Sequence, residues 1–145
     1  MKKNGGVLLI CEKTGNFLLG ERAKNIPFPD CWSIFGGGID EGESVLEGVK
    51  RELMEESQIP SDNIRYELFE IQYDIGDPYY FYLGYCEKEY ECILNDETQR
   101  YGWFNLDNLP KPLFPTLYIK YNGGKVNKVK KSKFNRFWER LMNMF

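Results

Sequence analysis

The most informative stretch of the chain is residues 35–59, whose sequence is FGGGIDEGESVLEGVKRELMEESQI. It places a triple glycine shortly before a strong helix-start signal. Ser44 and Glu47 have the capping-box spacing, in which a serine hydroxyl and a glutamate carboxylate each bind a free backbone amide of the first turn. Pro60 ends the pattern, because proline cannot continue a helix. The stretch therefore predicts a helix over residues 45–57.

The predicted helix carries an acidic arc beside an apolar stripe. The apolar stripe recurs every fourth residue and consists of Val45, Val49 and Leu53. The acidic arc spans about 100° of the helix surface and consists of Glu52, Glu55 and Glu56. Carboxylates this close repel one another, and a bound divalent cation removes that penalty. Oxygen ligands suit Mg²⁺, with Mn²⁺ as the alternative. The sequence therefore favours a metal site over a freely solvated acidic face.

The three glycines follow a short predicted strand at residues 32–35. Because glycine has no Cβ, this segment can come close to other groups. A glycine carbonyl is also a hard oxygen ligand of the kind that divalent cations accept. We expect Gly36, Gly37 and Gly38 to form a tight loop that aims its peptide groups toward the acidic arc.

The spacing in this stretch resembles the Nudix box, Gly-x5-Glu-x7-Arg-Glu-U-x-Glu-Glu-x-Gly-U, in which U is apolar. Six of its seven fixed residues and both apolar positions are present. Gln58 stands where the family has glycine, just past the predicted helix end. A left-handed residue is common there, so a glutamine costs up to about 1 kcal/mol. The likeness runs over about residues 7–110, and residues 111–145 lie outside it.

This resemblance implies both a fold and a reaction. The implied fold is α/β (α+β), a Nudix-like α/β/α sandwich on a mixed β-sheet, and we expect one domain over residues 1–145. The implied reaction is Mg²⁺-dependent hydrolysis of a pyrophosphate bond in a nucleoside diphosphate linked to a further group, such as a nucleoside triphosphate or a nucleotide sugar. Water would attack phosphorus in line. The alternative is a non-catalytic Nudix-like module that binds a nucleotide or RNA; such modules tend to lose the glutamates that are present here.

By position, the resemblance also implies roles for single residues. The implied metal ligands are Gly36, Glu52, Glu55, Glu56 and, from a late loop, Glu97. Glu52 is in addition a candidate general base. Arg51 is expected to steady the acidic cluster by ion pairing, unless it only forms a surface pair with Glu47. Glu43 is expected to support the loop before the helix.

Substrate contacts are expected outside this stretch. Arg22 and Lys24 are candidate cations for the phosphates. Rings that can stack on a base are Phe28, Tyr73, Tyr80 and Tyr82, although packing within the sheet is the alternative for each of them.

Short apolar and aromatic runs predict the strands of the sheet. The runs cover residues 6–12, 17–22, 32–35, 64–75, 79–87 and 101–106, with turns at 13–16 and 76–78. A single helical turn is expected at 106–109.

Composition narrows the chemistry. The 145 residues are 42% hydrophobic and 28% charged, as in a soluble globular domain. The chain has no histidine, which excludes Ser-His-Asp and Cys-His catalysis. Its four cysteines are scattered without a CxxC pair, which argues against a zinc site. No apolar run approaches the roughly 20 residues of a membrane span, and no signal peptide is recognisable. We therefore expect a cytoplasmic protein with no membrane partner.

Charge is divided unevenly along the chain. Residues 1–110 carry 10 Lys/Arg and 21 Asp/Glu, a net of −11, and residues 111–145 carry 9 Lys/Arg and one Glu, a net of +8. A basic amphipathic helix is predicted over about residues 132–145, from Phe134, Phe137, Trp138, Leu141, Met142 and Phe145. It would pack on its own domain, join a homodimer, or contact RNA or a membrane surface. The expected partner is a small-molecule nucleotide, bound by a monomer or homodimer; nucleic acid is not expected beyond capped RNA or a contact of this basic tail.

Overall fold

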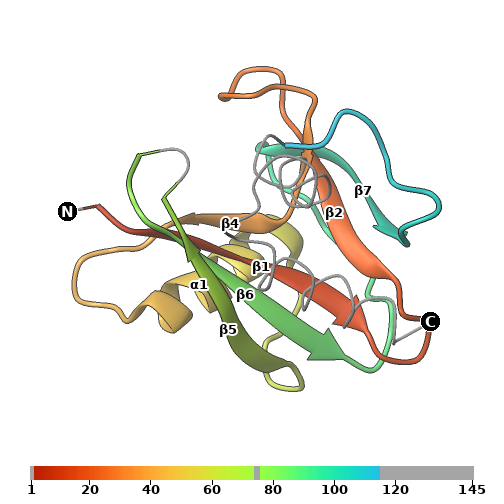
Figure 1. Cartoon of the computed structure of the whole chain (residues 1–145), viewed down its shortest axis with the longest axis horizontal. Coiled ribbons are helices and arrows are strands. Elements are labelled where there is room, and N and C mark those ends of the chain that lie inside the picture. Colours follow the sequence, from red (N-terminus) through yellow and green to blue (C-terminus); the bar gives the residue numbers. More distant parts are fainter. Residues whose placement is uncertain (1, 74–75, 115–145) are drawn as a thin grey trace, which may run out of the picture.

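The computed structural model describes residues 2–73 and 76–114 and shows an α+β fold with a mixed sheet, as predicted (Figure 1). In these residues there are seven strands and one helix. The strands are β1 (Asn4–Cys11), β2 (Phe17–Arg22), β3 (Trp32–Ser33), β4 (Phe35–Gly38), β5 (Arg65–Gln72), β6 (Tyr79–Cys86) and β7 (Thr98–Phe104), and the helix is α1 (Val45–Ser57). The predicted C-terminal helix and its basic tail lie outside the described residues. No helix in the described part has the length and hydropathy needed to cross a membrane.

Strand β1 is the centre of the sheet. The path of the sheet is β3-β2-β1-β6-β5, and β4 pairs with β1 while β7 pairs with β2. The β1–β6 pair is parallel, and the other pairs are antiparallel. Because side chains alternate along a strand, β1 feeds two cores. Leu8 and Ile10 join one core, whereas Val7 and Leu9 join the other, which α1 covers with Val49.

The helix has the predicted bounds and cap. The Ser44 hydroxyl accepts a hydrogen bond from the Glu47 backbone N–H at 3.1 Å, and the Glu47 carboxylate accepts one from the Ser44 N–H at 3.4 Å. Val49 and Leu53 are fully buried, as expected from the apolar stripe. Gln58 ends the helix with φ 59° and ψ 23°, the left-handed conformation that glycine adopts at least cost.

The glycines differ from the prediction. Gly36, Gly37 and Gly38 are strand residues of β4 and form no loop; Gly36 pairs with Gly6 and Gly37 with Gly5 of β1. Glycine is unfavourable in strands, so its presence predicts a turn. The strand forms here because the paired residues of β1 and β4 both lack side chains. Backbone atoms and neighbouring side chains occupy the space that Cβ atoms would need.

Two smaller predictions are also corrected. Strand β7 begins at Thr98, three residues before the expected start, because its pairing with β2 continues to Arg22 through an irregularity in the register. Residues 106–109 form a turn without a helix. The Asn108 side chain accepts a hydrogen bond from the Asn105 N–H at 2.6 Å, which closes the chain locally.

Steric contacts explain why the β1–β4 pair needs glycine. A Cβ at Gly36 would collide with the Gly5 carbonyl oxygen and would lie 2.5 Å from the Gly6 Cα. A Cβ at Gly6 would lie 2.7 Å from the Phe35 carbonyl oxygen and would collide with the Tyr79 hydroxyl. These obstacles are largely backbone atoms, which cannot move without breaking the ladder. We call the paired residues Gly5, Gly6, Gly36 and Gly37 the glycine ladder.

We predict that Gly36→Ala destabilises the protein by about 2 kcal/mol or more, since overpacking against fixed atoms typically costs about 1–3 kcal/mol. Gly38→Ala is the matched control on the same strand, because the nearest atom to its added Cβ is the Asn4 Oδ1 at 3.8 Å. Urea denaturation of both variants measures the difference. Equal midpoints for the two variants would contradict this account of the ladder.

Candidate functional site

Two glutamates of α1 point at the glycine ladder. The Glu56 carboxylate accepts a hydrogen bond from the Gly36 N–H at 2.8 Å and is almost fully buried, with 7% of the residue exposed. The Glu52 carboxylate occupies the space beside Gly37, where an added Cβ would lie 2.6 Å from the Glu52 Cδ. The missing side chains therefore create the volume in which both carboxylates lie.

The charges of this group are mutually unfavourable. Burial raises the pKa of Glu56 to about 9, with further increases from the negative charges of Glu52 and Glu97. The Gly36 N–H and the Arg22 guanidinium lower the same pKa but do not cancel these effects. Burial also raises the pKa of Glu52, although its contact with Arg51 opposes that. Glu52, Glu56 and Glu97, which we call the carboxylate cluster, therefore form a region that favours protons or a cation.

Arg51 makes the ion pairs expected of it. Its guanidinium lies 2.7 Å from Glu43, 3.1 Å from Glu52 and 3.2 Å from Glu55, and it donates to the Gly38 carbonyl at 2.9 Å. These contacts, above all the one with Glu43, raise the pKa of Arg51 further above its ordinary value. Arg51 thus joins the helix to β4 and to the loop before the helix.

Two glutamates near Arg51 have supporting positions. Glu43 accepts a hydrogen bond from the Asp40 N–H at 2.7 Å, so it holds the loop, as expected. The contact with Arg51 lowers the pKa of Glu43. Glu47 caps the helix, and the ion pairs of Arg51 in the described structure are with other acids. Glu55 is half-exposed and pairs with Arg51, so it lies at the rim of the carboxylate cluster.

The loop before β7 brings Glu97 to the cluster. The Glu97 carbonyl accepts a hydrogen bond from the Ala23 N–H at 2.9 Å, which ties this loop to the end of β2. The Asn95 side chain donates to the Glu55 carbonyl at 3.2 Å, which ties the loop to the last turn of α1. Glu97 and Glu56 line one cavity of about 460 Å³, together with the three β4 glycines. Glu97 thus lies beside Glu56 in this cavity, and its role as a metal ligand stays a prediction.

Cations also line this carboxylate cavity. Arg22 donates its Nε–H to the Pro27 carbonyl at 2.8 Å, which leaves the other guanidinium nitrogens for a ligand. Burial lowers the pKa of Arg22, and the nearby Glu56 raises it. Lys2 is a second lining cation. No sequence motif marks Lys2, because it reaches the cavity only through the pairing of β1 with β4.

Lys24 and Phe28 are not among the residues that line this cavity. The Lys24 ammonium is largely exposed and lies 2.9 Å from the Asp30 carboxylate. Phe28 packs edge-on against Phe114, with 4.9 Å between the ring centroids. Both predicted substrate contacts are thus engaged by other residues.

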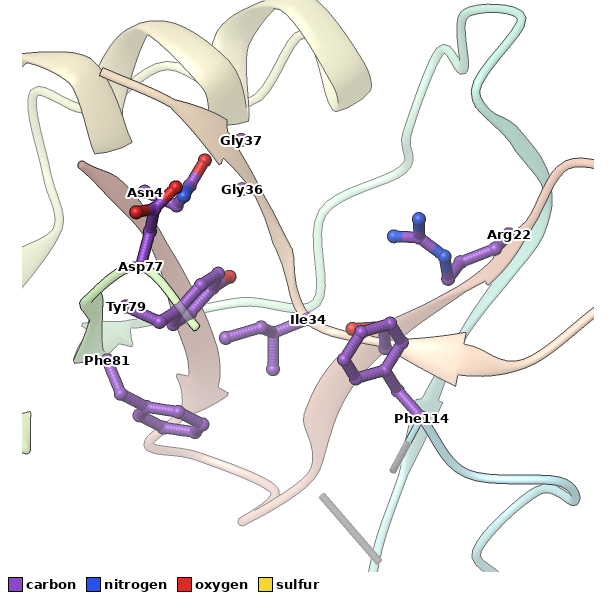
Figure 2. A pocket seen from close by; sticks show the side chains of 10 residues that line it. Asn4, Arg22, Ile34, Gly36, Gly37, Asp77, Tyr79, Phe81 and Phe114 are labelled. Carbon is purple, nitrogen blue, oxygen red and sulfur yellow. The ribbon is translucent and has the colours of Figure 1, made fainter. Parts of the chain in front are cut away.

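Tyr80 lies on the face of the sheet that α1 covers. It pairs with Gly5, and an added Cβ on Gly5 would touch both Val49 of α1 and Tyr80. Tyr82 also packs in the α1-side core, and Tyr73 is exposed. Tyr79 and Phe81 point the opposite way and line a second cavity of about 250 Å³ beside Gly36 (Figure 2). The sequence shows the aromatic run, but it does not show which of these residues face the cavity.

Whether these residues fit a divalent cation follows from their donor atoms. Within residues 2–73 and 76–114, no group of three or more His, Cys, Asp or Glu side chains has its donors already gathered for a metal ion. The carboxylate cluster nevertheless offers only hard oxygen donors and carries a repulsion that a cation relieves. The donor chemistry therefore fits Mg²⁺ or Mn²⁺, provided that the Glu52 and Glu97 side chains turn toward Glu56.

Comparison with known proteins agrees with this geometry. The family model described as NUDIX domain matches residues 2–121. The oxidized purine nucleoside triphosphate hydrolase of Mus musculus is 32% identical over 82 residues, which are 54% of this chain and 52% of that protein. The nucleoside triphosphatase NudI of Salmonella newport is 28% identical over 124 residues, 75% of this chain and 86% of that protein. The chain thus spans about half the length of the mouse relative and most of NudI.

A solved structure supports the same fold. The crystal structure of a MutT NUDIX hydrolase from Burkholderia pseudomallei has a TM-score of 0.63 and 27% sequence identity. The match covers 81% of this chain and 93% of that chain.

We predict that the metal-free protein loses stability as the pH rises from about 4.5 toward 9. The folded state binds the Glu56 proton more tightly than the unfolded state does, because the folded pKa is about 9 and the ordinary value is 4.5. The resulting stabilisation is complete below the unfolded pKa and is lost as the pH rises through the folded pKa. Melting temperatures of chelator-treated protein between pH 5 and 9 measure this loss.

The matched variants for this melt are Glu56→Gln and Glu47→Gln. Glu56→Gln should lack most of the decline, and Glu47→Gln should keep it, since Glu47 lies at the helix start. Parallel declines in wild type and Glu56→Gln would show that Glu56 is not the group that titrates.

Proposed function

This chain belongs to the Nudix family of nucleotide pyrophosphohydrolases, and we propose that it cleaves a pyrophosphate bond in a nucleoside triphosphate with the aid of a divalent cation. The observation that carries the proposal is the position of Glu56 and Glu97 in the cavity that Arg22 also lines, with the Glu52 carboxylate beside Gly37 and its charge raising the pKa of Glu56. The names of the NudI and mouse relatives support a triphosphate as the substrate.

The phosphates of the substrate would lie in the carboxylate cavity. Arg22 presents guanidinium N–H groups that match phosphate oxygens, and the Pro27 carbonyl fixes its direction. Lys2 supplies a second positive charge at the same cavity. Anions would otherwise be repelled by the carboxylate cluster, so these two cations determine where a phosphate chain can enter.

A divalent cation, Mg²⁺ or Mn²⁺, would supply charge neutralisation on the phosphates and activation of water. We assign Glu52, Glu56 and Glu97 to hold it, together with the Gly36 carbonyl. The Glu55 side chain is half-exposed, unlike that of Glu52, so we assign Glu55 to the rim of the site.

We assign Glu52 as the general base. Burial raises its pKa, which brings it toward the range where a carboxylate accepts a proton effectively. Water would attack a phosphorus atom in line, its proton would pass to the Glu52 carboxylate, and the bond to the leaving phosphate oxygen would break. Arg51 positions Glu52 through the contact at 3.1 Å and would keep the carboxylate aimed at the cavity.

A non-catalytic nucleotide- or RNA-binding module is the other candidate. It would need no carboxylate cluster, and the Arg51 network that holds Glu52 in place would then serve no chemistry. The buried Glu56, whose pKa is about 9, stays neutral at neutral pH unless a cation lies beside it, and the proposed reaction supplies that cation.

We predict that Glu56→Gln lowers kcat/KM by about 100-fold or more in the presence of Mg²⁺, because removing one group that stabilises transition-state charge typically costs that much. A chelator should abolish the activity of the wild type. Phosphate or pyrophosphate release from nucleoside triphosphates measures both effects, beside a thermal melt that confirms folding.

Glu47→Gln is the control for activity, since glutamine also closes a capping box. It should retain nearly the full rate. A folded Glu56→Gln variant that works at the wild-type rate, or wild-type turnover in excess chelator after metal stripping, would overturn the assignment.

A further inference from the structure

We propose that Gln99, supported by Asp30, is a positioning residue of the proposed reaction. It ties the backbone of Arg22 to the loop that carries Glu97, and so sets the distance between the cation for the phosphates and a carboxylate for the metal ion. The inference rests on the proposed function, because it names the link between two groups of the same site. Gln99 and Asp30 are not among the residues that line the carboxylate cavity, so they act through others.

Arg22 and Glu97 belong to different segments, which meet at the end of β2. Arg22 is the last residue of β2, and Glu97 directly precedes β7. Beyond the last paired residues of these strands, the Ala23 N–H donates to the Glu97 carbonyl at 2.9 Å. Backbone hydrogen bonds at the end of a ladder open easily. The position of the Glu97 side chain relative to Arg22 therefore depends on further contacts.

Gln99 is the extra residue of a β-bulge. In the pair of β2 with β7, Glu21 lies opposite Arg100. The next residue, Arg22, lies opposite Thr98, so Gln99 has no partner residue on β2. A bulge changes the direction of its extra side chain and the phase of the strand beyond it. Here the bulge brings the Gln99 side chain to the Arg22 carbonyl.

The Gln99 amide uses both of its N–H groups at this junction. Its Nε2 lies 2.7 Å from the Arg22 carbonyl oxygen and 2.6 Å from the Asp30 Oδ1. The amide nitrogen carries two hydrogens, so it donates one to each oxygen. The Arg22 carbonyl also accepts the Asp30 N–H at 3.0 Å. Gln99 thus joins β7 to both ends of residues 23–31, which we call the β2–β3 loop.

The β2–β3 loop also fixes the Arg22 side chain. Its Pro27 carbonyl accepts the Arg22 Nε–H at 2.8 Å. The guanidinium lies 5.1 Å from the ring centroid of Phe114 (Figure 2). Phe28 of the same loop packs edge-on against that ring. A displacement of the loop would therefore move the cation that we assign to the phosphates.

Two residues of the β2–β3 loop have a left-handed backbone. Phe28 has φ 55° and Asp30 has φ 63°. Aspartate tolerates this conformation, but it is unfavourable for a bulky residue such as phenylalanine. Strained residues persist where surrounding contacts hold them, and they concentrate at functional sites. The Asp30 carboxylate provides such contacts, to Gln99 and to the Lys24 ammonium at 2.9 Å.

The junction lies at the surface, which allows positioning to be separated from folding. Gln99 is exposed, and the Asp30 side chain is 46% exposed. Polar contacts in such places contribute little to global stability. The same contacts connect two groups of the site, where a misplacement of about 1 Å can cost about 100-fold in rate. Their removal should therefore reduce the rate much more than the melting temperature.

The test compares wild type with Gln99→Ala at saturating Mg²⁺ and nucleoside triphosphate. We expect kcat to fall by about 10-fold and KM to change by less than about twofold, because the phosphate contacts remain but their alignment with the metal site is lost. The melting temperature should fall by less than about 4 °C. Asp107→Ala is the matched control, since Asp107 is exposed and follows the opposite end of β7. It should leave kcat unchanged.

Two variants of Asp30 separate its carboxylate from its backbone conformation. Glycine adopts a φ of 63° without strain, so Asp30→Gly removes the acceptor and keeps the loop conformation. It should lower kcat as Gln99→Ala does. Asparagine also tolerates this backbone and keeps a side-chain oxygen for Gln99. Asp30→Asn should therefore retain at least about half of the wild-type kcat.

Amide hydrogen exchange of the metal-free protein measures the link without any turnover. The Ala23 N–H, which donates to the Glu97 carbonyl, belongs to a residue that is 6% exposed. In Gln99→Ala its exchange should become faster by about 10-fold or more, because local opening is easier. The amide of Val49, in the interior of α1, should exchange as in wild type.

The outcomes keep the two proposals apart. Unchanged exchange at Ala23 in Gln99→Ala, or faster exchange at Ala23 with an unchanged kcat, would overturn the positioning role. An equal rise at Val49 would show global destabilisation and would overturn it as well. A wild type that cleaves no nucleoside triphosphate would overturn the proposed function, and the exchange at Ala23 would still decide whether Gln99 holds the two segments together.

Discussion

The rest of the structure depends on one steric constraint, the absence of side chains where β1 and β4 pair. Gly5 and Gly6 lie opposite Gly37 and Gly36, so two backbones meet with no Cβ atoms between them. The space left on one side holds the Glu52 carboxylate, and the space on the other holds the Tyr79 hydroxyl. The ladder also leaves the Gly36 N–H free to bind Glu56. Packing, carboxylate placement and cavity shape thus have one common origin.

The buried carboxylates beside the glycine ladder destabilise the fold. Burying Glu56 near Glu52 and Glu97 raises its pKa to about 9, which means that its charge is disfavoured at neutral pH. Arg51 compensates at the rim, through Glu43, Glu52 and Glu55, but its ion pairs in the described structure do not include Glu56. Local rules are broken mainly where function requires it. A cation, which the proposed reaction needs, would remove the conflict that the fold creates.

Much of the fold was predictable because its signals are local. The capping box and Pro60 gave the helix bounds, and alternating runs gave most strands. The role of the glycines was not predictable, because the pairing of β4 with β1 joins segments that are far apart in the sequence. The face on which Tyr80 lies was not predictable for a related reason: it depends on the pairing of β6 with β1, not on composition.

The position of the cation is the central claim, and crystals grown with Mn²⁺ test it most directly. An anomalous difference map would locate the ion without reference to activity. We expect a peak beside Gly36, within about 2.2 Å of carboxylate oxygens from Glu52 and Glu56. A map with full occupancy elsewhere, or with no peak at these carboxylates at saturating Mn²⁺, would contradict the account.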